Sequence, residues 1–236
     1  MRILGIESSS LVASVAIVED GVTMAEYSAN FKKTHSQTLL PMIDSMVNLL
    51  GVSLSTIDAI AISGGPGSFT GLRIGSATAK GLGLALQKPL IHVPTLDGTA
   101  WNLFGASGII CPIMDARRNQ VYTGLYRFEH EFEVLMEQDA LDMNALIERL
   151  NAMGERVIFL GDGVPVHEAL IREKMTVPYD FAPAHMNRQR AAAVAALGEV
   201  YLKEGKTESA AEHGPDYLRK SQAEREREER ECAARA

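Results

Sequence analysis

Residues 62–75 have the sequence ISGGPGSFTGLRIG, which joins the end of an apolar strand to the start of a helix through a glycine-rich turn. The pattern predicts the strand at 59–62 and the helix at 72–86. Glycine buries little surface and costs backbone entropy, so core packing does not account for so many glycines. Such a turn either brings the backbone close to another group or makes a tight crossover that binds nothing. In the first case, the loop amides and the helix N-terminus would favour an anion such as phosphate.

The glycine-rich turn matches neither of two well-known nucleotide-binding patterns. It lacks the Gly-Lys-Ser/Thr ending of a Walker loop, and it lacks the spacing and the downstream acid of a Rossmann fingerprint. From the turn alone, a phosphate contact and a crossover without a ligand both stay open. The residues that we take as candidates for the phosphate contact are Ser9, Gly65, Gly67, Ser68 and Gly71.

The chain has 236 residues, of which 46% are hydrophobic, and this length suits one large domain or two small ones. Its net charge of −7 argues against a large nucleic-acid surface acting alone, because phosphate binding needs clustered Lys and Arg. Cys111 and Cys232 lie far apart without metal-ligand spacing, so we expect no disulfide and a reducing compartment. No apolar run approaches the ~18 residues of a membrane-spanning helix, and the N-terminus turns acidic too early for a signal peptide. We expect a cytoplasmic protein without a membrane contact.

Two similar strand-and-helix patterns follow each other along the chain. Asp20-Gly21 is a strong hairpin signal between the second and third strands. In the first long helix, apolar residues recur at intervals of three and four until Gly51 ends it. Strands are expected at 3–6, 12–18, 22–31, 59–62, 90–93, 109–114, 121–127 and 157–160, and helices at 36–50, 72–86, 95–104, 143–153, 166–174 and 189–204.

The pattern of strands restarts after the sequence GASG at 105–108. We therefore expect a first lobe at 1–105, a shorter second lobe at 106–219 and a charged tail at 220–236. The tail alternates Arg and Glu, as an exposed frayed helix or a disordered segment does.

The order of the first elements resembles that of the actin/Hsp70/sugar-kinase superfamily: two antiparallel strands, a helix, a strand, a glycine loop and a helix. In that fold the first hairpin turn contacts phosphate and often carries an Asp that holds magnesium through water. Here the acid is Glu7, and Ser8, Ser9 and Ser10 follow it. Serine hydroxyls can donate to phosphate, but serines are also ordinary turn residues.

More specific motifs are ILGIESS at 3–9, THSQ at 34–37, GPGSFTGLRIG at 65–75, DAR at 115–117 with VY at 121–122, and PDYLR at 215–219. Together they resemble the TsaB family. The resemblance implies an α/β fold of two actin-like lobes, each with a mixed sheet flanked by helices. It also implies a non-catalytic subunit that pairs with TsaD, the enzyme that transfers a threonylcarbamoyl group to the adenosine beside the anticodon of tRNAs reading codons that begin with A.

The resemblance further implies partners and cofactors. The expected partners are TsaD in a heterodimer, the companion ATPase TsaE and, through the complex, tRNA. Alone, the chain would be a monomer or a homodimer. No intrinsic cofactor is expected, because the second lobe lacks a second glycine-rich nucleotide loop. ATP or ADP with magnesium would bind only in the assembled complex.

The residues that replace the metal ligands of TsaD support a role without catalysis. The family His-x-x-x-His of TsaD falls on Thr95 and Thr99, and a neutral hydroxyl is a poor ligand for a transition metal. His92 stands alone at the end of a strand, and we interpret it as structural. His35 is interpreted as a capping or interface residue. The other histidines, His213 among them, form no metal-spaced cluster, so we expect no metal site.

The helices expected at 36–50 and 72–86 are the candidate surface for TsaD or for a second copy of the chain. The alternative is that these faces only pack on the sheet. The second helix has so many small residues that another backbone is expected to approach it closely. The candidate interface residues are Leu39, Met42, Ile43, Met46, Gly75, Ala79 and Gly83.

Two enzymatic alternatives use the same fold. An ATP-dependent small-molecule kinase would need a catalytic Asp and an adenosine pocket in the second lobe, and the sequence indicates neither. Asp162 is interpreted as a surface turn residue. A metallo-glycoprotease is disfavoured by Thr95 and Thr99. A nucleophile is not indicated, because Ser68 is not in a Gly-x-Ser-x-Gly elbow and Cys111 lies in an apolar strand. We therefore expect no catalytic residue and no enzyme activity of the chain by itself.

Overall fold

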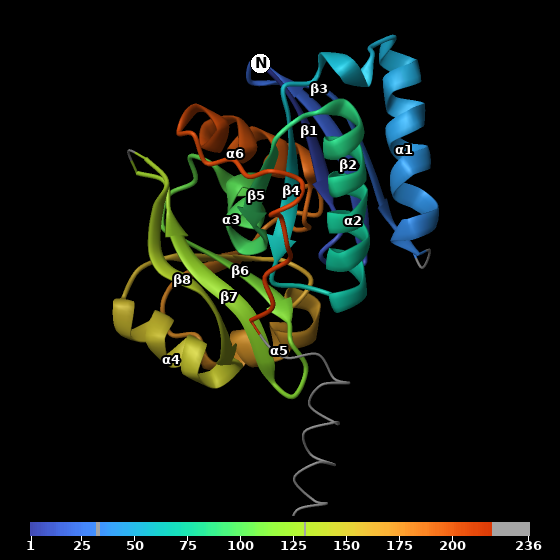
Figure 1. The fold of residues 1–236 in the computed structure, drawn as a ribbon. Helices are drawn as coiled ribbons and strands as arrows, with labels where there is room; N and C mark the ends of the chain where they lie inside the picture. Colours follow the sequence, from blue (N-terminus) through green and yellow to red (C-terminus); the bar gives the residue numbers. More distant parts are fainter. Residues whose placement is uncertain (32–33, 130, 219–236) are drawn as a thin grey trace, which may run out of the picture.

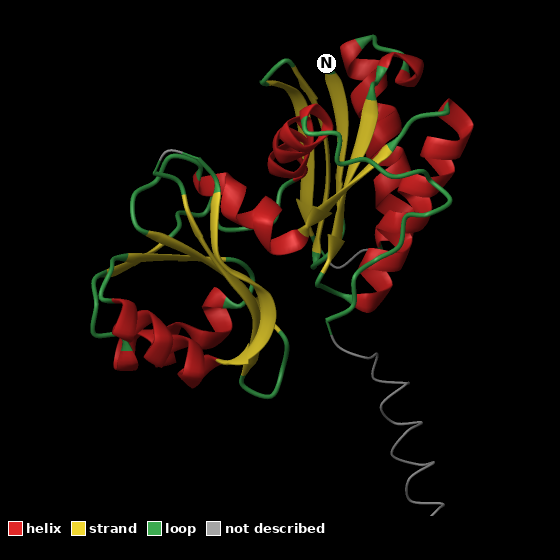
Figure 2. Ribbon diagram, turned by 60° about the vertical axis from the view of Figure 1, so that its left-hand side comes forward, coloured by secondary structure: helices red, strands yellow, loops and turns green. Residues whose placement is uncertain are grey.

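The computed structural model describes residues 1–31, 34–129 and 131–218. The expected tail at 220–236, with Cys232, lies outside these residues. The described chain forms two lobes, each with one five-stranded sheet (Figures 1 and 2). This architecture is the actin-like α/β fold that the sequence indicated.

The first sheet has the strand order β3-β2-β1-β4-β5. β1 pairs antiparallel with β2 and parallel with β4, and β5 continues the parallel half. Asp20 and Gly21 both have positive φ, at 48° and 78°, as a two-residue hairpin turn of the type I′ requires. The strands are β1 (Arg2–Glu7), β2 (Val12–Glu19), β3 (Val22–Asn30), β4 (Ala59–Gly65) and β5 (Leu90–Pro94).

The second sheet repeats this topology, in the order β8-β7-β6-β9-β10. β6 pairs antiparallel with β7 and parallel with β9, as β1 does with β2 and β4. The similarity between the halves of the sequence therefore corresponds to a structural repeat. The strands are β6 (Ile109–Asp115), β7 (Gln120–Arg127), β8 (Glu133–Asp142), β9 (Val157–Leu160) and β10 (Tyr179–Phe181).

Each sheet lies between helices, because alternate side chains of its strands face opposite layers. The outer layer of the first sheet is formed by α1 and α2, and that of the second sheet by α4 and α5. The α-helices are α1 (His35–Leu50), α2 (Phe69–Leu86), α3 (Thr95–Ala100), α4 (Met143–Met153), α5 (Val164–Lys174) and α6 (Ala191–Lys203).

The two remaining helices each cross to the other lobe. Leu96 and Ala100 of α3 pack with Ile110 and Leu160 of the second sheet. Conversely, α6 follows the second sheet in sequence but packs on the first, where Ala195 joins a core of small and branched residues that covers β1, β4 and β5. Figure 2 shows the helix beside the first sheet. Thus the expected second-lobe range, 106–219, contains a helix that forms part of the first lobe's core.

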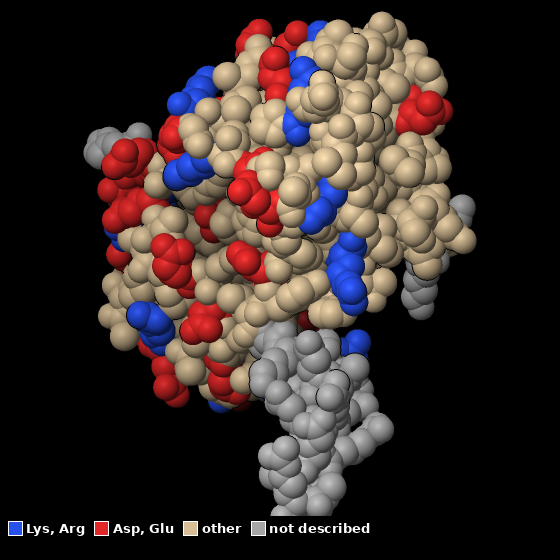
Figure 3. Space-filling view, viewed as in Figure 1, with Lys and Arg blue, Asp and Glu red and all other residues tan. Residues whose placement is uncertain are grey.

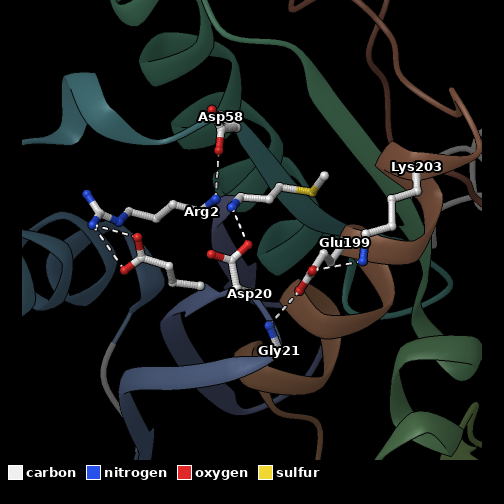
Figure 4. Close-up of polar contacts among 8 residues, drawn as sticks. Arg2, Asp20, Gly21, Asp58, Glu199 and Lys203 are labelled. Atoms are coloured by element: carbon white, nitrogen blue, oxygen red, sulfur yellow. Dashed lines mark hydrogen bonds and ion pairs between the residues drawn. The ribbon is translucent and has the colours of Figure 1, made fainter.

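Polar contacts hold the far end of α6 to the first sheet (Figure 4). The Glu199 carboxylate accepts a hydrogen bond from the Gly21 amide at 3.1 Å and pairs with Lys203 at 3.0 Å. On the neighbouring strands, the N-terminal ammonium group pairs with Asp20, and the Arg2 amide donates to Asp58. The β2–β3 turn and α6 therefore form one connected surface.

The helices and strands expected from the sequence are present within a few residues of their predicted bounds, but β8 and β10 were missed. Cys111 is fully buried in β6, and burial raises the pKa of its thiol to about 12, so it is not a nucleophile. Within the described residues, no helix is long and apolar enough to cross a bilayer.

Candidate functional site

A cleft of about 610 Å³ lies between the lobes. Its first-lobe wall consists of the serine turn at 8–10, the beginning of α1 and the glycine loop that leads into α2. Its second-lobe wall consists of the turn at 115–117, Tyr122 and Asp162. Residues 216–218, in the segment after α6, complete the lining.

The glycine loop is narrow because it packs against the serine turn of its own chain. A Cβ atom on Gly71 would lie 2.1 Å from the carbonyl oxygen of Ser8, and one on Gly67 would lie 2.3 Å from that of Ser9. Neither position has room for a side chain unless the backbone moves. The close approach inferred from the sequence is thus made within the chain itself.

The hydroxyls expected to meet phosphate already have partners. Ser9 donates both its amide and its hydroxyl to the Glu7 carboxylate, the amide at 2.6 Å. Ser8 donates to the carbonyl of Gly71 at 3.0 Å, and the Ser68 hydroxyl accepts from the Gly71 amide as the N-cap of α2. Burial raises the pKa of Glu7, whose carboxyl group is only 1% exposed. The Ser8 and Ser9 hydroxyls thus fix the loop rather than present free donors, whereas the Ser68 hydroxyl serves here only as an acceptor.

The charges of the cleft do not favour a bare anion. Asp115, Asp162 and Asp216 line it, whereas Arg117 is the one Lys or Arg side chain among its described lining residues. Burial raises the pKa of Asp162. The fold family implies an adenine nucleotide, but these residues fit a nucleotide poorly unless a metal ion offsets its charge.

The predicted site residues lie only partly in the cleft. Ser9, Gly67, Ser68 and Gly71 line it, whereas Gly65 lies behind it, at φ +128° and against the backbone of Asp216. The interpretation of Asp162 as a surface residue was wrong, because it lines the cleft. The structural repeat explains this position. β9 has the place in the second sheet that β4 has in the first, and Asp162 follows β9 as the glycine loop follows β4.

His35 holds the serine turn to α1. Its Nε2–H donates to the carbonyl of Ser10 at 2.8 Å, and the residue is 9% exposed. The N-cap of α1 is Thr34, so His35 is not the capping residue. Its side chain instead joins the beginning of α1 to the serine turn at the edge of the cleft.

Thr95 and Thr99, on which the resemblance placed the histidines of TsaD, are buried and hydrogen-bonded. The Thr95 hydroxyl lies 2.9 Å from that of Ser63 and accepts from the Gly65 amide at 3.1 Å. The Thr99 hydroxyl donates to the carbonyl of Thr95 at 2.7 Å. Both side chains therefore stabilise the start of α3 and the glycine loop.

Most of the predicted interface residues are core residues. On α1 the more apolar face points to the sheet, so it is not open to a partner. Met42 is half-buried and is the exception. On α2, Gly75 and Gly83 approach other parts of the chain: a Cβ atom would lie 2.1 Å from the Ser8 hydroxyl at Gly75 and 3.0 Å from Leu90 at Gly83. The residues placed in the interior are Leu39, Ile43, Met46, Gly75, Ala79 and Gly83.

The outer surface of α1 and α2 nevertheless carries few charges. Asp44 is the one Asp, Glu, Lys or Arg residue of α1, and α2 has only Arg73 and Lys80. Figure 3 shows this part of the molecule as largely uncharged, in contrast to the acidic surface of the second lobe. Three leucines are exposed there: Leu40 by 54%, Leu49 by 71% and Leu84 by 65%. We call the outer surface of α1 and α2 that carries these residues the leucine face, on which Leu40 and Leu49 lie on opposite flanks of α1.

A second group of polar side chains lies outside the cleft. His92, Glu208 and His213 each offer a ligand atom, and these atoms lie within 4.8 Å of one another. The interpretation of His92 as isolated was therefore wrong. The group could not be recognised from sequence spacing, because its members come from β5 and from the segment after α6.

Two comparisons place the chain among known proteins. The family model for TsaD, tRNA N6-adenosine threonylcarbamoyltransferase, matches residues 24–227. A tRNA threonylcarbamoyladenosine biosynthesis protein TsaB from Bacillus subtilis is 34% identical over 95% of this chain and 96% of its own length. The TsaB of Escherichia coli is 40% identical over 54% of this chain and 55% of its own length.

A solved structure supports the same family relationship. YeaZ from Pseudomonas aeruginosa superposes with a TM-score of 0.77 and 28% sequence identity, over 92% of this chain and 99% of that one. Fold and cleft thus define a two-lobed actin-like protein related to the threonylcarbamoyltransferases. Within that class, the chain belongs to the TsaB family, and its role lies in the biosynthesis of threonylcarbamoyladenosine in tRNA.

Proposed function

We propose that the chain is a non-catalytic subunit that binds TsaD in the cytoplasm and holds it in the form that modifies tRNA. The observation that carries the proposal is the leucine face, an exposed and nearly uncharged part of α1 and α2. A surface of two neighbouring helices with few charges suits a protein–protein contact, because the centre of such contacts is depleted of charged residues. A partner that covers them gains hydrophobic free energy at little cost in charge desolvation.

The environment of Thr95 supports the absence of catalysis by this chain alone. Its hydroxyl is held by Ser63 and by the Gly65 amide, so it is not available to a metal ion or a substrate. The cleft, with its three aspartates, would take ATP or ADP only with magnesium and in the assembled complex. TsaE and tRNA would act through that complex, and a homodimer of this chain would use the same leucine face.

A reconstitution tests the proposal. The purified chain and TsaD are mixed, analysed by size exclusion, and assayed for tRNA modification with the companion ATPase and the enzyme that forms threonylcarbamoyl-adenylate. We expect a heterodimer, and modification only when both proteins are present. Full modification in the absence of this chain, or without any complex, contradicts the proposal.

A second measurement distinguishes the proposed non-catalytic role from that of a kinase. The chain alone is assayed for ATP turnover beside Glu7→Gln, which alters the turn that would meet the phosphates. We expect no turnover from either sample. Turnover by the wild-type chain that Glu7→Gln abolishes would instead support a kinase.

A further inference from the structure

The segment after α6 returns to the first sheet and runs along its edge strand. Leu90 of β5 and Glu208 exchange two backbone hydrogen bonds, both of 2.9 Å. Further along, the Asp216 amide donates to the carbonyl of Gly64 at 2.7 Å. The segment therefore joins β5 to the start of the glycine loop.

Polar side chains gather where this segment meets β5. His92 lies two residues beyond Leu90, so both side chains point to the same face of the strand. The rings of His92 and His213 are 5.8 Å apart, between centroids. The His213 Nδ1–H donates to the Glu208 carboxylate at 2.6 Å. Asp216 approaches as well, with its Oδ2 3.2 Å from His92 Nε2.

Each imidazole has one buried nitrogen that lacks a hydrogen bond among the described residues. His213 is 2% exposed, and its Nε2 is buried without a partner. His92 Nε2 is also buried, and its contact with Asp216 does not have hydrogen-bond geometry. A buried polar atom without a partner costs free energy, so two such atoms in one cluster indicate a missing ligand.

The donor set resembles that of a metal centre. Two imidazoles and one carboxylate are ligands that zinc and related divalent ions accept, and a carboxylate commonly orients a ligating histidine through its other nitrogen. Ligands around a tetrahedral zinc ion lie about 3.4 Å apart, at bond lengths of about 2.1 Å. The His92 side chain is 23% exposed and that of Asp216 61%, so both can move toward Nε2 of the buried His213.

We propose that His92 and His213 bind one divalent transition-metal ion of the zinc type through their Nε2 atoms, with Asp216 as the nearby oxygen donor and Glu208 holding the His213 ring through Nδ1. The site is structural: the ion joins the C-terminal segment to the edge of the first sheet. A Cβ atom on Gly64 would lie 2.1–2.5 Å from three ring atoms of His92, so the ion would also fix the ring against the glycine loop. The nearby cation, Lys80, donates to the carbonyls of Ala211 and His213 and so does not occupy the donor atoms of the cluster.

Calorimetric titration tests the proposal with the full-length, untagged chain after treatment with a chelator. Zinc chloride is titrated at neutral pH, and cobalt chloride is used as a spectroscopic probe of tetrahedral coordination. We expect one ion per chain, a melting temperature raised by zinc, and cobalt d–d bands. His92→Gln and His213→Gln should each weaken binding by about a hundredfold or more, and Glu208→Gln by about tenfold or more.

Matched controls are His185→Gln and Glu212→Gln, which change exposed residues outside the cluster. They should bind zinc as the wild type does. His92 is partly exposed, so His92→Gln tests the site even if His213→Gln does not fold. Absence of saturable binding by the wild type overturns the proposal. Binding that persists unchanged in His92→Gln, or that a control variant abolishes instead, also overturns it.

Discussion

The hydroxyl of Tyr126 donates to the carboxylate of Asp97 at 2.8 Å and so joins the second sheet to the helix that follows the first. Tyr126 lies in β7 and Asp97 in α3, and both are buried. Tyr201 of α6 donates to the other oxygen of the same carboxylate at 3.1 Å. One carboxylate thus connects the two helices that cross between the lobes.

Removing the hydroxyl should destabilise the contact between the lobes. We expect Tyr126→Phe to lower the free energy of unfolding by about 1–3 kcal/mol, because it leaves a buried carboxylate oxygen without its donor. Urea unfolding measures the change. In a cycle with Asp97→Asn, the double variant should lose less than the sum of the single losses. Additive losses would mean that the two groups are not coupled.

The same carboxylate should make stability depend on pH. Burial raises the pKa of Asp97. The folded chain therefore keeps this proton to a higher pH than the unfolded chain does, and the favourable contribution of Asp97 falls as pH rises above about 4 through the folded pKa. Asp97→Asn cannot titrate, so its stability should decline less over that window. Unfolding curves at several pH values check this, with the exposed Asp44→Asn as control. Parallel curves for Asp97→Asn and the wild type would contradict the prediction.

Two glycines of α2 should respond oppositely to alanine. Gly71→Ala places a methyl group 2.1 Å from the Ser8 carbonyl oxygen and should cost about 1–3 kcal/mol. Around Gly81 nothing lies within 4 Å of such a methyl group, so Gly81→Ala should stabilise the helix by about 0.5–1 kcal/mol. Thermal melting of both variants gives the comparison. If Gly71→Ala is as stable as the wild type, the loop does not need its close contact with the serine turn.

Charge on the leucine face should weaken the TsaD complex and leave the fold intact. Leu40→Glu should lower the affinity by about thirtyfold, or about 2 kcal/mol, because it places a carboxylate in an apolar contact. The matched control is Val166→Glu, which changes a residue of the second lobe that is 59% exposed. Binding is measured by calorimetry and folding by circular dichroism. Equal affinities of Leu40→Glu and the wild type would exclude α1 from the interface.

The sequence predicted the regular elements well where a local pattern defines them. Helix α1 was expected at 36–50 and spans His35–Leu50, because its apolar residues keep helical spacing until Gly51 adopts a positive φ. Strands β8 and β10 were missed because they lie at sheet edges and are mostly exposed or half-exposed, so their apolar pattern is weak.

The candidate site was predicted less completely, for two physical reasons. Helical periodicity identifies an apolar face but not what covers it, and the face of Leu39 and Ile43 turned out to pack on the sheet. Contacts between distant segments leave no mark in local spacing. His92 and His213 meet only because the chain returns to β5 after α6, and Asp162 lines the cleft only because the second sheet repeats the first.

The crossing of α6 has a consequence for synthesis of the protein. Strands β1–β5 end at Pro94, but the helix that covers one face of their sheet comprises Ala191–Lys203. While the chain grows on the ribosome, the side chains of Ile3, Ala61 and Val93 therefore stay uncovered until α6 is made. That helix is translated almost 100 residues after Pro94. Exposed aliphatic surface on a nascent chain promotes aggregation and attracts chaperones. A premature stop just before codon 191 would thus leave the strands of both sheets complete but uncover one face of the first.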